Sequence, residues 1–255
     1  MPNPSHVFVV GSAGSGKTYS MLHEYKRMVF ITFVRYSSFA NHCISMKEKG
    51  IDFGVVIADR LAPLVLPHKE VIILDMSKFR NIVGETPAER MKMAQDREMF
   101  LIDLIRKNKN YYTTFAIDEA QIIFPASTQT ARTQHFLDFL STSRNEGIRI
   151  ILASQRPQSV SSSAVGLMRA FVCMRVNDKN GIKAIDEALQ QLGTGDYVQQ
   201  NQTLTQVGMR KNYVFSWNTQ HMNLIYRINN TIIWYQNHRL IGSEEWKIIW
   251  NPQLV

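Results

Sequence analysis

Eight consecutive residues near the N-terminus have the composition that binding of nucleotide phosphates requires. They fit the pattern G-x-x-x-x-G-K-[ST] and are Gly11, Ser12, Ala13, Gly14, Ser15, Gly16, Lys17 and Thr18. Small residues let the backbone curl so that several N–H groups point at one phosphate, and a helix that opens here adds its positive dipole end. Lys17 can reach the β- and γ-phosphates, and the Thr18 hydroxyl can bind Mg²⁺. Because a strand-like run precedes the loop, we favour an ATP and Mg²⁺ site over a glycine-rich loop without a ligand.

Two adjacent carboxylates, Asp118 and Glu119, follow the apolar run Thr114–Ile117. Asp118 would hold Mg²⁺ through its water shell, and Glu119 would polarise the attacking water. The alternative is an acidic pair that caps a helix after a strand. A glutamate after the metal-binding aspartate favours a hydrolase over a kinase. The long separation from the phosphate loop leaves room for a strand between the two motif strands.

Gln155 and Arg144 are two further candidates for the catalytic site, one on either side of the apolar run Ile150–Ala153. Gln155 could sense the γ-phosphate, although taken alone a polar strand end is the more frequent explanation. Arg144 ends a helix, and its guanidinium could protrude at a subunit edge and neutralise transition-state charge in a neighbour. The alternative for Arg144 is a favourable interaction with the helix dipole. If the first interpretation is correct, the enzyme is an oligomer.

The elements that must position these residues follow the pattern of an α/β fold. β-Branched and aromatic runs predict strands at Val7–Val10, Val29–Val34, Gly54–Ala58, Val71–Leu74, Thr113–Ile117, Ile148–Ala153 and Phe171–Val176. Helices are expected at Lys17–Arg27, Ser45–Lys49, Pro87–Lys107, Arg132–Ser143 and Gly181–Leu192, the third with a capping box from Thr86 to Glu89. The fold class is therefore a RecA-like (ASCE) P-loop NTPase, with a mostly parallel central sheet flanked by helices.

The residue composition of the chain changes after Gly195. Aromatic and polar residues alternate in strand-like runs, and Asn229-Asn230 separates two of them as a hairpin turn would. We expect an ATPase domain at 1–195 and a small β-rich C-terminal appendage at 196–255, which could pack on the same domain. The aromatic and basic residues of this tail could stack on and neutralise nucleic acid, but a β-sheet core with solvated charges is the favoured interpretation.

Composition limits the partners and the compartment. The 255 residues carry a net charge of +8, and 45% of them are hydrophobic. The positive charge has two interpretations: the protein binds a polyanionic partner, or it is a soluble protein that is merely basic. The two cysteines, Cys43 and Cys173, and the scattered histidines give no metal spacing or disulfide framework. No signal peptide and no apolar run of roughly 18 residues is visible. We expect a soluble protein without a transmembrane segment, in the cytoplasm.

The order and spacing of these motifs resemble the HerA/FtsK family of DNA-pumping ATPases, which includes viral genome-packaging ATPases. The likeness is closest over Ser143–Pro157, with the sequence SRNEGIRIILASQRP, and covers about residues 6–190. The resemblance implies that Arg144 reaches a neighbouring subunit's ATP, that Gln155 senses the γ-phosphate, and that Lys17, Thr18, Asp118 and Glu119 have the roles given above. It also implies a homo-oligomeric ring, by resemblance a hexamer. The tail has no counterpart in the family.

The sequence therefore predicts an ATP-hydrolysing translocase of double-stranded DNA, most simply a viral genome-packaging motor. Its location would be the host cytoplasm or the virion, and a viral capsid or membrane protein is a candidate partner. One set of alternatives is a helicase-like replication ATPase or an export ATPase of filamentous-phage assembly. A different class is a non-motor, NTP-dependent switch or DNA-binding regulator.

Overall fold

The computed structural model describes residues 6–126, 134–168, 170–173, 180–181 and 183–184, together with the backbone of four strands between 212 and 245. The strands are β1 (Val7–Val10), β2 (Met28–Thr32), β3 (Phe53–Ile57), β4 (Val71–Asp75), β5 (Thr114–Ile117), β6 (Arg149–Ser154), β7 (Ala170–Cys173), β8 (Asn212–Asn218), β9 (His221–Ile228), β10 (Thr231–Gln236) and β11 (Arg239–Glu245). The helices are α1 (Lys17–Glu24), α2 (Ala40–Glu48), α3 (Pro87–Asn108), α4 (Gln134–Ser143) and α5 (Ser162–Gly166). Short 3₁₀ turns η1 (Tyr36–Phe39), η2 (Ser77–Phe79), η3 (Ala120–Ile122), η4 (Arg144–Glu146) and η5 (Pro157–Ser159) connect them.

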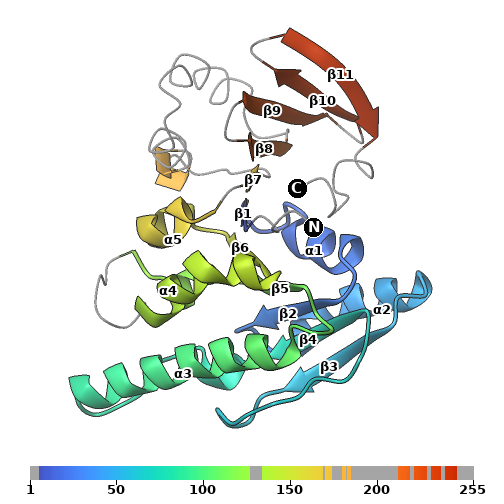
Figure 1. The fold of residues 1–255 in the computed structure, drawn as a ribbon. Coiled ribbons are helices and arrows are strands. Elements are labelled where there is room, and N and C mark those ends of the chain that lie inside the picture. The colour runs from blue at the N-terminus through green and yellow to red at the C-terminus, as the bar shows by residue number, and fades with distance from the viewer. Residues whose placement is uncertain are drawn as a thin grey trace.

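The described strands form one sheet in the order β11-β10-β9-β8-β7-β1-β6-β5-β2-β4-β3 (Figure 1). All the pairings from β7 to β3 are parallel. Strand β6 lies between β1, which leads into the phosphate loop, and β5, which leads into Asp118 and Glu119. The extra strand that the sequence left room for is therefore present, and the predicted RecA-like fold class is confirmed.

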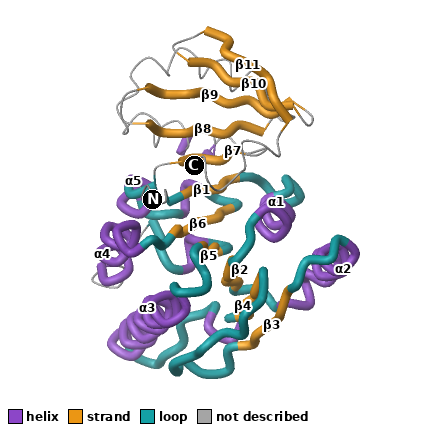
Figure 2. Tube along the Cα trace, turned by 45° about the vertical axis from the view of Figure 1, so that its right-hand side comes forward, coloured by secondary structure: helices purple, strands orange, loops and turns teal. Residues whose placement is uncertain are grey.

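Helices cover both faces of the parallel part of the sheet, with α1 and α2 on one side and α3, α4 and α5 on the other (Figure 2). Successive residues of β1 face opposite layers: Val7 and Val9 join the cluster under α1 and α2, while Phe8 and Val10 join the larger cluster under α3, α4 and α5. Burial on both faces explains why these strands read as continuous apolar runs instead of alternating ones.

The boundaries of the helices differ from the predicted ones where tertiary contacts decide them. Helix α1 ends at Glu24 and not at Arg27, because Tyr25 is extended and Arg27 takes a positive φ of 53° before β2. Helix α2 begins at Ala40, five residues before the predicted start. Its sequence carries little amphipathic signal, and its main anchor among the described side chains is the buried Met46.

The backbone of β8 to β11 extends the sheet beyond β7, and each of these strands pairs antiparallel with its neighbour. In the pairing of β9 with β10, Ile228 lies opposite Thr231, the register that the predicted hairpin requires. Strand β11 was not predicted, and the strand-like run Trp246–Trp250 lies outside the described residues, as does most of the predicted helix Gly181–Leu192. The tail's aromatic and basic side chains also lie outside, and the domain division at 195 stays a prediction.

Within the part of the chain that the structure describes, no helix has the length and apolar character needed to cross a bilayer.

The capping box of α3 is a local stabilising feature that can be tested alone. The Glu89 N–H donates to Thr86 Oγ1 at 3.2 Å, and the Thr86 N–H donates to Glu89 Oε2 at 3.1 Å. Thr86→Ala leaves a free N–H at the helix start and should lower the free energy of unfolding by about 1 kcal/mol, measured by urea denaturation. Thr86→Ser keeps the hydroxyl and should retain most of the stability; an equal loss in both variants would contradict the cap.

Candidate nucleotide-binding site

The phosphate loop occupies the carboxyl end of β1, where ligands of open α/β sheets bind. Gly14 and Gly16 have φ values of 71° and 96°, and a Cβ at either position would meet no atom within 4 Å. Glycine is therefore needed for the left-handed backbone and not for space. The Gly11 N–H donates to the Ser154 carbonyl at 3.3 Å, which ties the loop to the end of β6.

Lys17 lies inside this loop and is only 5% exposed. Its ammonium donates to the carbonyl oxygens of Gly11 and Ser12, the latter at 3.1 Å. Burial lowers the pKa of Lys17, while the nearby Asp118 carboxylate acts to raise it. Lys17 thus binds carbonyl oxygens of its own loop. The charged phosphate oxygens of a nucleotide would form stronger hydrogen bonds with this ammonium than the two carbonyls do.

Asp118 follows β5 and is 6% exposed. Burial, and then the neighbouring Glu119 charge, raise the pKa of Asp118 to about 6, against the lowering effect of Lys17 and Arg80. A carboxylate this buried fits a hard divalent cation, and Mg²⁺ commonly uses one or two protein oxygens together with water and substrate phosphates. Asp118 and the Thr18 hydroxyl supply such oxygens, so the donor set is compatible with Mg²⁺, whose binding here stays a prediction.

Glu119 begins the turn η3 with a left-handed backbone, φ 53° and ψ 53°. Its Oε2 atom lies 2.9 Å from Arg80 Nη1, and the side chains are 14% and 44% exposed, respectively. No N–H is aligned on this oxygen, so the contact is an ion pair and not a directed hydrogen bond. The sequence analysis did not find Arg80. The signal for it was positional, because Arg80 follows β4 and the carboxyl ends of parallel strands meet at one edge.

Gln155 lies exposed directly after β6, between the ends of β1 and β5. The preceding Ser154 is fully buried, and its hydroxyl donates to Gln121 Oε1 at 2.9 Å and accepts from the Arg156 N–H at 3.0 Å. With the Gly11 contact to its carbonyl, Ser154 joins the phosphate loop, the end of β6 and the turn after Glu119. Sequence reasoning missed both Ser154 and Gln121.

Arg144 lies at the amino ends of the strands, whereas the other candidate residues lie at the carboxyl ends. It opens η4, which leads into the amino end of β6. Six residues of extended strand span roughly 20 Å, so Arg144 is about that far from the phosphate loop of its own chain. The structure therefore brings together Lys17, Thr18, Asp118, Glu119 and Gln155 at the carboxyl edge, and leaves Arg144 apart from them.

A buried arginine of α3 supports the turns around the site. The Arg97 guanidinium donates to the carbonyls of Phe79 at 2.9 Å, Arg80 at 3.2 Å and Ile122 at 2.7 Å. Burial lowers the pKa of Arg97 to about 10, and Glu98 acts to raise it. One side chain thus fastens the turn that carries Arg80 to the turn that follows Glu119.

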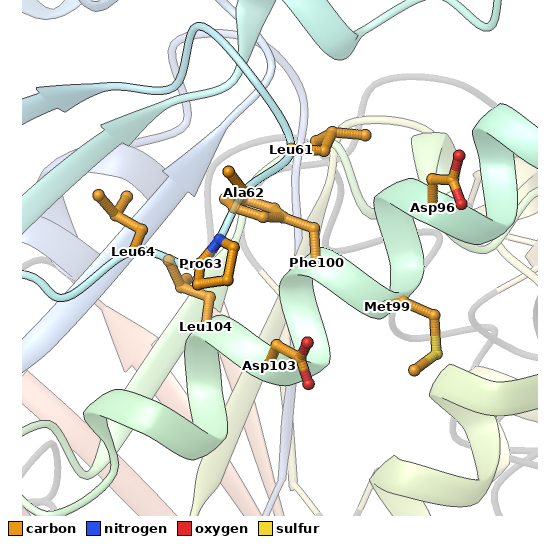
Figure 3. Close-up of a pocket in the computed structure, with 9 residues that line it drawn as sticks. All are labelled: Leu61, Ala62, Pro63, Leu64, Asp96, Met99, Phe100, Asp103 and Leu104. Atoms are coloured by element: carbon orange, nitrogen blue, oxygen red, sulfur yellow. The ribbon is translucent and has the colours of Figure 1, made fainter.

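A cavity of about 270 Å³ lies between α3 and the loop segment Leu61–Leu64 and is not part of this site (Figure 3). Its lining residues are Leu61, Ala62, Pro63, Leu64, Asp96, Met99, Phe100, Asp103 and Leu104. None of them belongs to the phosphate loop or to the carboxyl ends of the strands, so the cavity is separate from the proposed nucleotide site.

Solved structures with a similar fold include viral NTPases. The genome packaging NTPase B204 of Sulfolobus turreted icosahedral virus 2, in complex with AMPPCP, is 17% identical with a TM-score of 0.53 and covers 88% of this chain and 98% of that one. Its sulfate complex gives 14% identity, a TM-score of 0.55, and 87% and 96% coverage. The DNA-packaging ATPase B204 of Sulfolobus Turreted Icosahedral Virus gives 16%, 0.51, and 88% and 98%. No protein-family model and no curated protein sequence matches the chain.

At these identities the likeness shows the fold alone: this chain has the fold of RecA-like P-loop NTPases, with a glycine-rich loop after β1. The narrower HerA/FtsK resemblance stays a prediction.

Glu98, beside Arg97, gives a pH-dependent test of this scaffold. It is 2% exposed, and burial raises its pKa to about 8 although the Phe136 N–H and Arg97 act to lower it. Because the pKa in the folded state exceeds the value of 4.5 for an unburied group, the folded chain keeps a proton that the unfolded chain loses. The free energy of unfolding should therefore fall as the pH rises from about 4.5 to about 8.

Glu98→Gln removes this dependence, because the amide stays neutral at every pH. We expect near-equal stability of the two proteins at pH 5 and a gain for the variant of roughly 2–4 kcal/mol at pH 8.5, measured by urea denaturation. Asp96→Asn on the exposed face of α3 is the matched control and should follow the wild type at both pH values. A constant difference between Glu98→Gln and wild type would contradict the burial of an ionisable carboxyl.

Proposed function

We propose that this protein is an ATP hydrolase that moves double-stranded DNA, as the genome-packaging motor of a virus. The observation that carries the proposal is the placement of β6. Its carboxyl end brings Gln155 between the phosphate loop and the Asp118–Glu119 pair, while Arg144 stands at its amino end, away from its own site. Gln155 would sense the γ-phosphate of its own subunit, and Arg144 would act as an arginine finger, a guanidinium that reaches the ATP of a neighbouring subunit. Their positions at opposite ends of one strand fit a motor in which each ATP lies between two subunits.

In the proposed reaction, the loop N–H groups and Lys17 bind the β- and γ-phosphates, and Glu119 takes up a proton from the attacking water. Asp118 and Thr18 hold Mg²⁺, which when bound offsets the charge of the phosphate oxygens. Arg144 of the adjacent subunit stabilises the transition state. Gln155 responds to loss of the γ-phosphate, and its neighbour Ser154 is bonded to both the phosphate loop and the turn after Glu119.

DNA as the partner is supported by the net charge of +8 and by the fold shared with B204, a genome packaging NTPase. A motor that follows the phosphate backbone needs charge and not base recognition. The HerA/FtsK resemblance implies that the protein forms a homo-oligomeric ring, as a hexamer. It also implies that the protein is located in the host cytoplasm or the virion. A viral capsid or membrane protein remains the candidate for a further partner.

The test of the reaction is steady-state ATP hydrolysis at low salt, with and without long double-stranded DNA. Wild-type turnover should rise several-fold with DNA. Glu119→Gln should still bind ATP but lose on the order of 10²-fold or more in kcat, because it removes the general base. Turnover that does not respond to DNA would leave an ATPase but reject the translocase, and would favour a non-motor switch or an export ATPase.

The finger is tested by mixing two inactive proteins. Arg144→Ala lacks the finger but has an intact site of its own, whereas Glu119→Gln lacks the base but has an intact finger. Mixed subunits should regain hydrolysis above the average of the two, because a Glu119→Gln subunit can supply Arg144 to an Arg144→Ala neighbour. A mixture of Glu119→Gln with Lys17→Ala is the control and should regain nothing. If the first mixture also regains nothing, Arg144 does not act between subunits.

A further inference from the structure

The turn that begins with Arg144 is fastened to helix α3 by an ion pair. Turn η4 spans Arg144–Glu146, and Glu146 Oε2 accepts a hydrogen bond from Lys109 Nζ at 2.6 Å. The side chains of Lys109 and Glu146 are 34% and 28% exposed, so the contact is partly shielded from water. Lys109 directly follows the last residue of α3, and the pair therefore joins two elements that lie 37 residues apart in the sequence.

Lys109 is held in place by the residue before it. Asn108 is 6% exposed, and its side-chain oxygen accepts the Leu66 N–H at 2.9 Å. Its side-chain amide donates to the carbonyls of Leu64 at 3.1 Å and Leu104 at 2.8 Å. Two of these bonds tie the end of α3 to the loop that precedes β4. A lysine on a backbone fixed in this way is a firmer anchor than a lysine on a free surface.

The backbone of η4 is closed by its own hydrogen bonds. The Gly147 N–H donates to the Arg144 carbonyl at 3.0 Å, and the Ile148 N–H donates to the Ser143 carbonyl at 3.2 Å. Gly147 has a φ of 76°, and a Cβ there would meet no atom within 4 Å, so glycine is needed for the left-handed backbone that ends the turn. The turn is thus a compact unit that one further contact can orient.

The ion pair determines the direction in which the Arg144 side chain leaves the turn. A 3₁₀ turn has about three residues per turn, so side chains two residues apart point roughly 120° away from each other. Because Glu146 is directed to the end of α3, the Arg144 side chain leaves η4 in a different direction. A guanidinium that acts on a neighbouring subunit needs such a fixed direction, because a misplacement of about 1 Å can cost on the order of 10²-fold in rate.

From these contacts we infer that Lys109 is a positioning residue for Arg144: through Glu146 it holds η4 in the orientation from which the Arg144 guanidinium reaches the ATP of the neighbouring subunit. The inference rests on the proposed role of Arg144, and it adds a residue outside the sequence motifs. Lys109 lies near the amino end of β5, at the end of the sheet away from its own phosphate loop. It therefore acts on the rate of hydrolysis in the neighbour and not on the binding of ATP to its own subunit.

The first experiment measures steady-state ATP hydrolysis by Lys109→Ala. Its kcat should fall about two- to fivefold, the range expected for loss of one partly exposed ion pair, with the KM for ATP changed less than about twofold. Lys109→Arg keeps the cation and should stay near the wild type. Lys69→Ala is the matched control, because it removes a comparable ion pair, with Asp52 at 2.8 Å, that does not involve η4. An unchanged kcat in Lys109→Ala, or an equal loss in Lys69→Ala, would overturn the inference.

A mixture of Lys109→Ala with Glu119→Gln subunits tests where Lys109 acts. A Glu119→Gln subunit keeps the Lys109–Glu146 pair and can supply a well-placed Arg144 to the intact site of a Lys109→Ala neighbour. Hydrolysis by an equal mixture should therefore exceed the average of the two separate proteins by about 1.5- to threefold. A mixture at the average would place the effect of Lys109 inside its own subunit, as a merely structural role would, and the inference would be wrong.

Variants of Arg144 separate this inference from the proposed function. In an Arg144→Ala background, Lys109→Ala should cause no further loss of kcat, because no guanidinium is left to position; a further loss would contradict the inference. If Arg144→Ala alone hydrolyses ATP like the wild type, the proposed role of Arg144 fails, and the inference fails with it. If Arg144→Ala is slow and Lys109→Ala is not, only the inference fails.

Discussion

The burial of two opposite charges at one edge of a parallel sheet is the constraint on which the rest of the site depends. Lys17 is 5% exposed and Asp118 is 6% exposed. Burial shifts the pKa of each toward its neutral form, and each opposes the shift of the other. A buried pair of this kind adds little to stability and can reduce it, because desolvation offsets the attraction between the charges. The phosphates and the metal ion of a bound nucleotide would supply the missing opposite charges, so the arrangement makes sense as a binding site and not as a structural bridge.

Fixed turns keep these charges in place. Arg97 bonds three carbonyl oxygens from two loops, and Glu98, one residue on, accepts from the N–H of Phe136 in the first turn of α4. Helix α3 is thereby joined to the turns that hold Arg80 and Glu119 and to the helix that leads to Arg144. Burial at this position raises the pKa of Glu98 and so favours its neutral form.

The sequence predicted the features that are determined by residues close together in the chain. Strand β1 was predicted with its observed bounds, because four apolar residues end at the loop glycine, and the α3 capping box was readable because Thr86 and Glu89 are three residues apart. The α/β class followed from the alternation of strand-like and helical runs, and the spacing of the two motifs left room for the strand between them. Arg80, Ser154 and Gln121 could not be found in this way, because their roles arise from contacts across strands. The start of α2 was wrong for a related reason, since packing and not propensity determines it.

Strand β6 shows how one short element can link two sites. All six of its residues are buried, and it pairs with β1 on one side and β5 on the other, so it cannot shift without its neighbours. Its amino end is held by His6, whose Nδ1 accepts the Ile150 N–H at 3.0 Å and whose Nε2 then donates to the Leu140 carbonyl at 2.9 Å. That contact joins β6 to the end of α4, directly before Arg144. If Arg144 acts on a neighbouring subunit, it does so from just before the amino end of the strand whose carboxyl end leads to Gln155. The buried strand therefore couples the position of Arg144 to that of Gln155 in the same subunit.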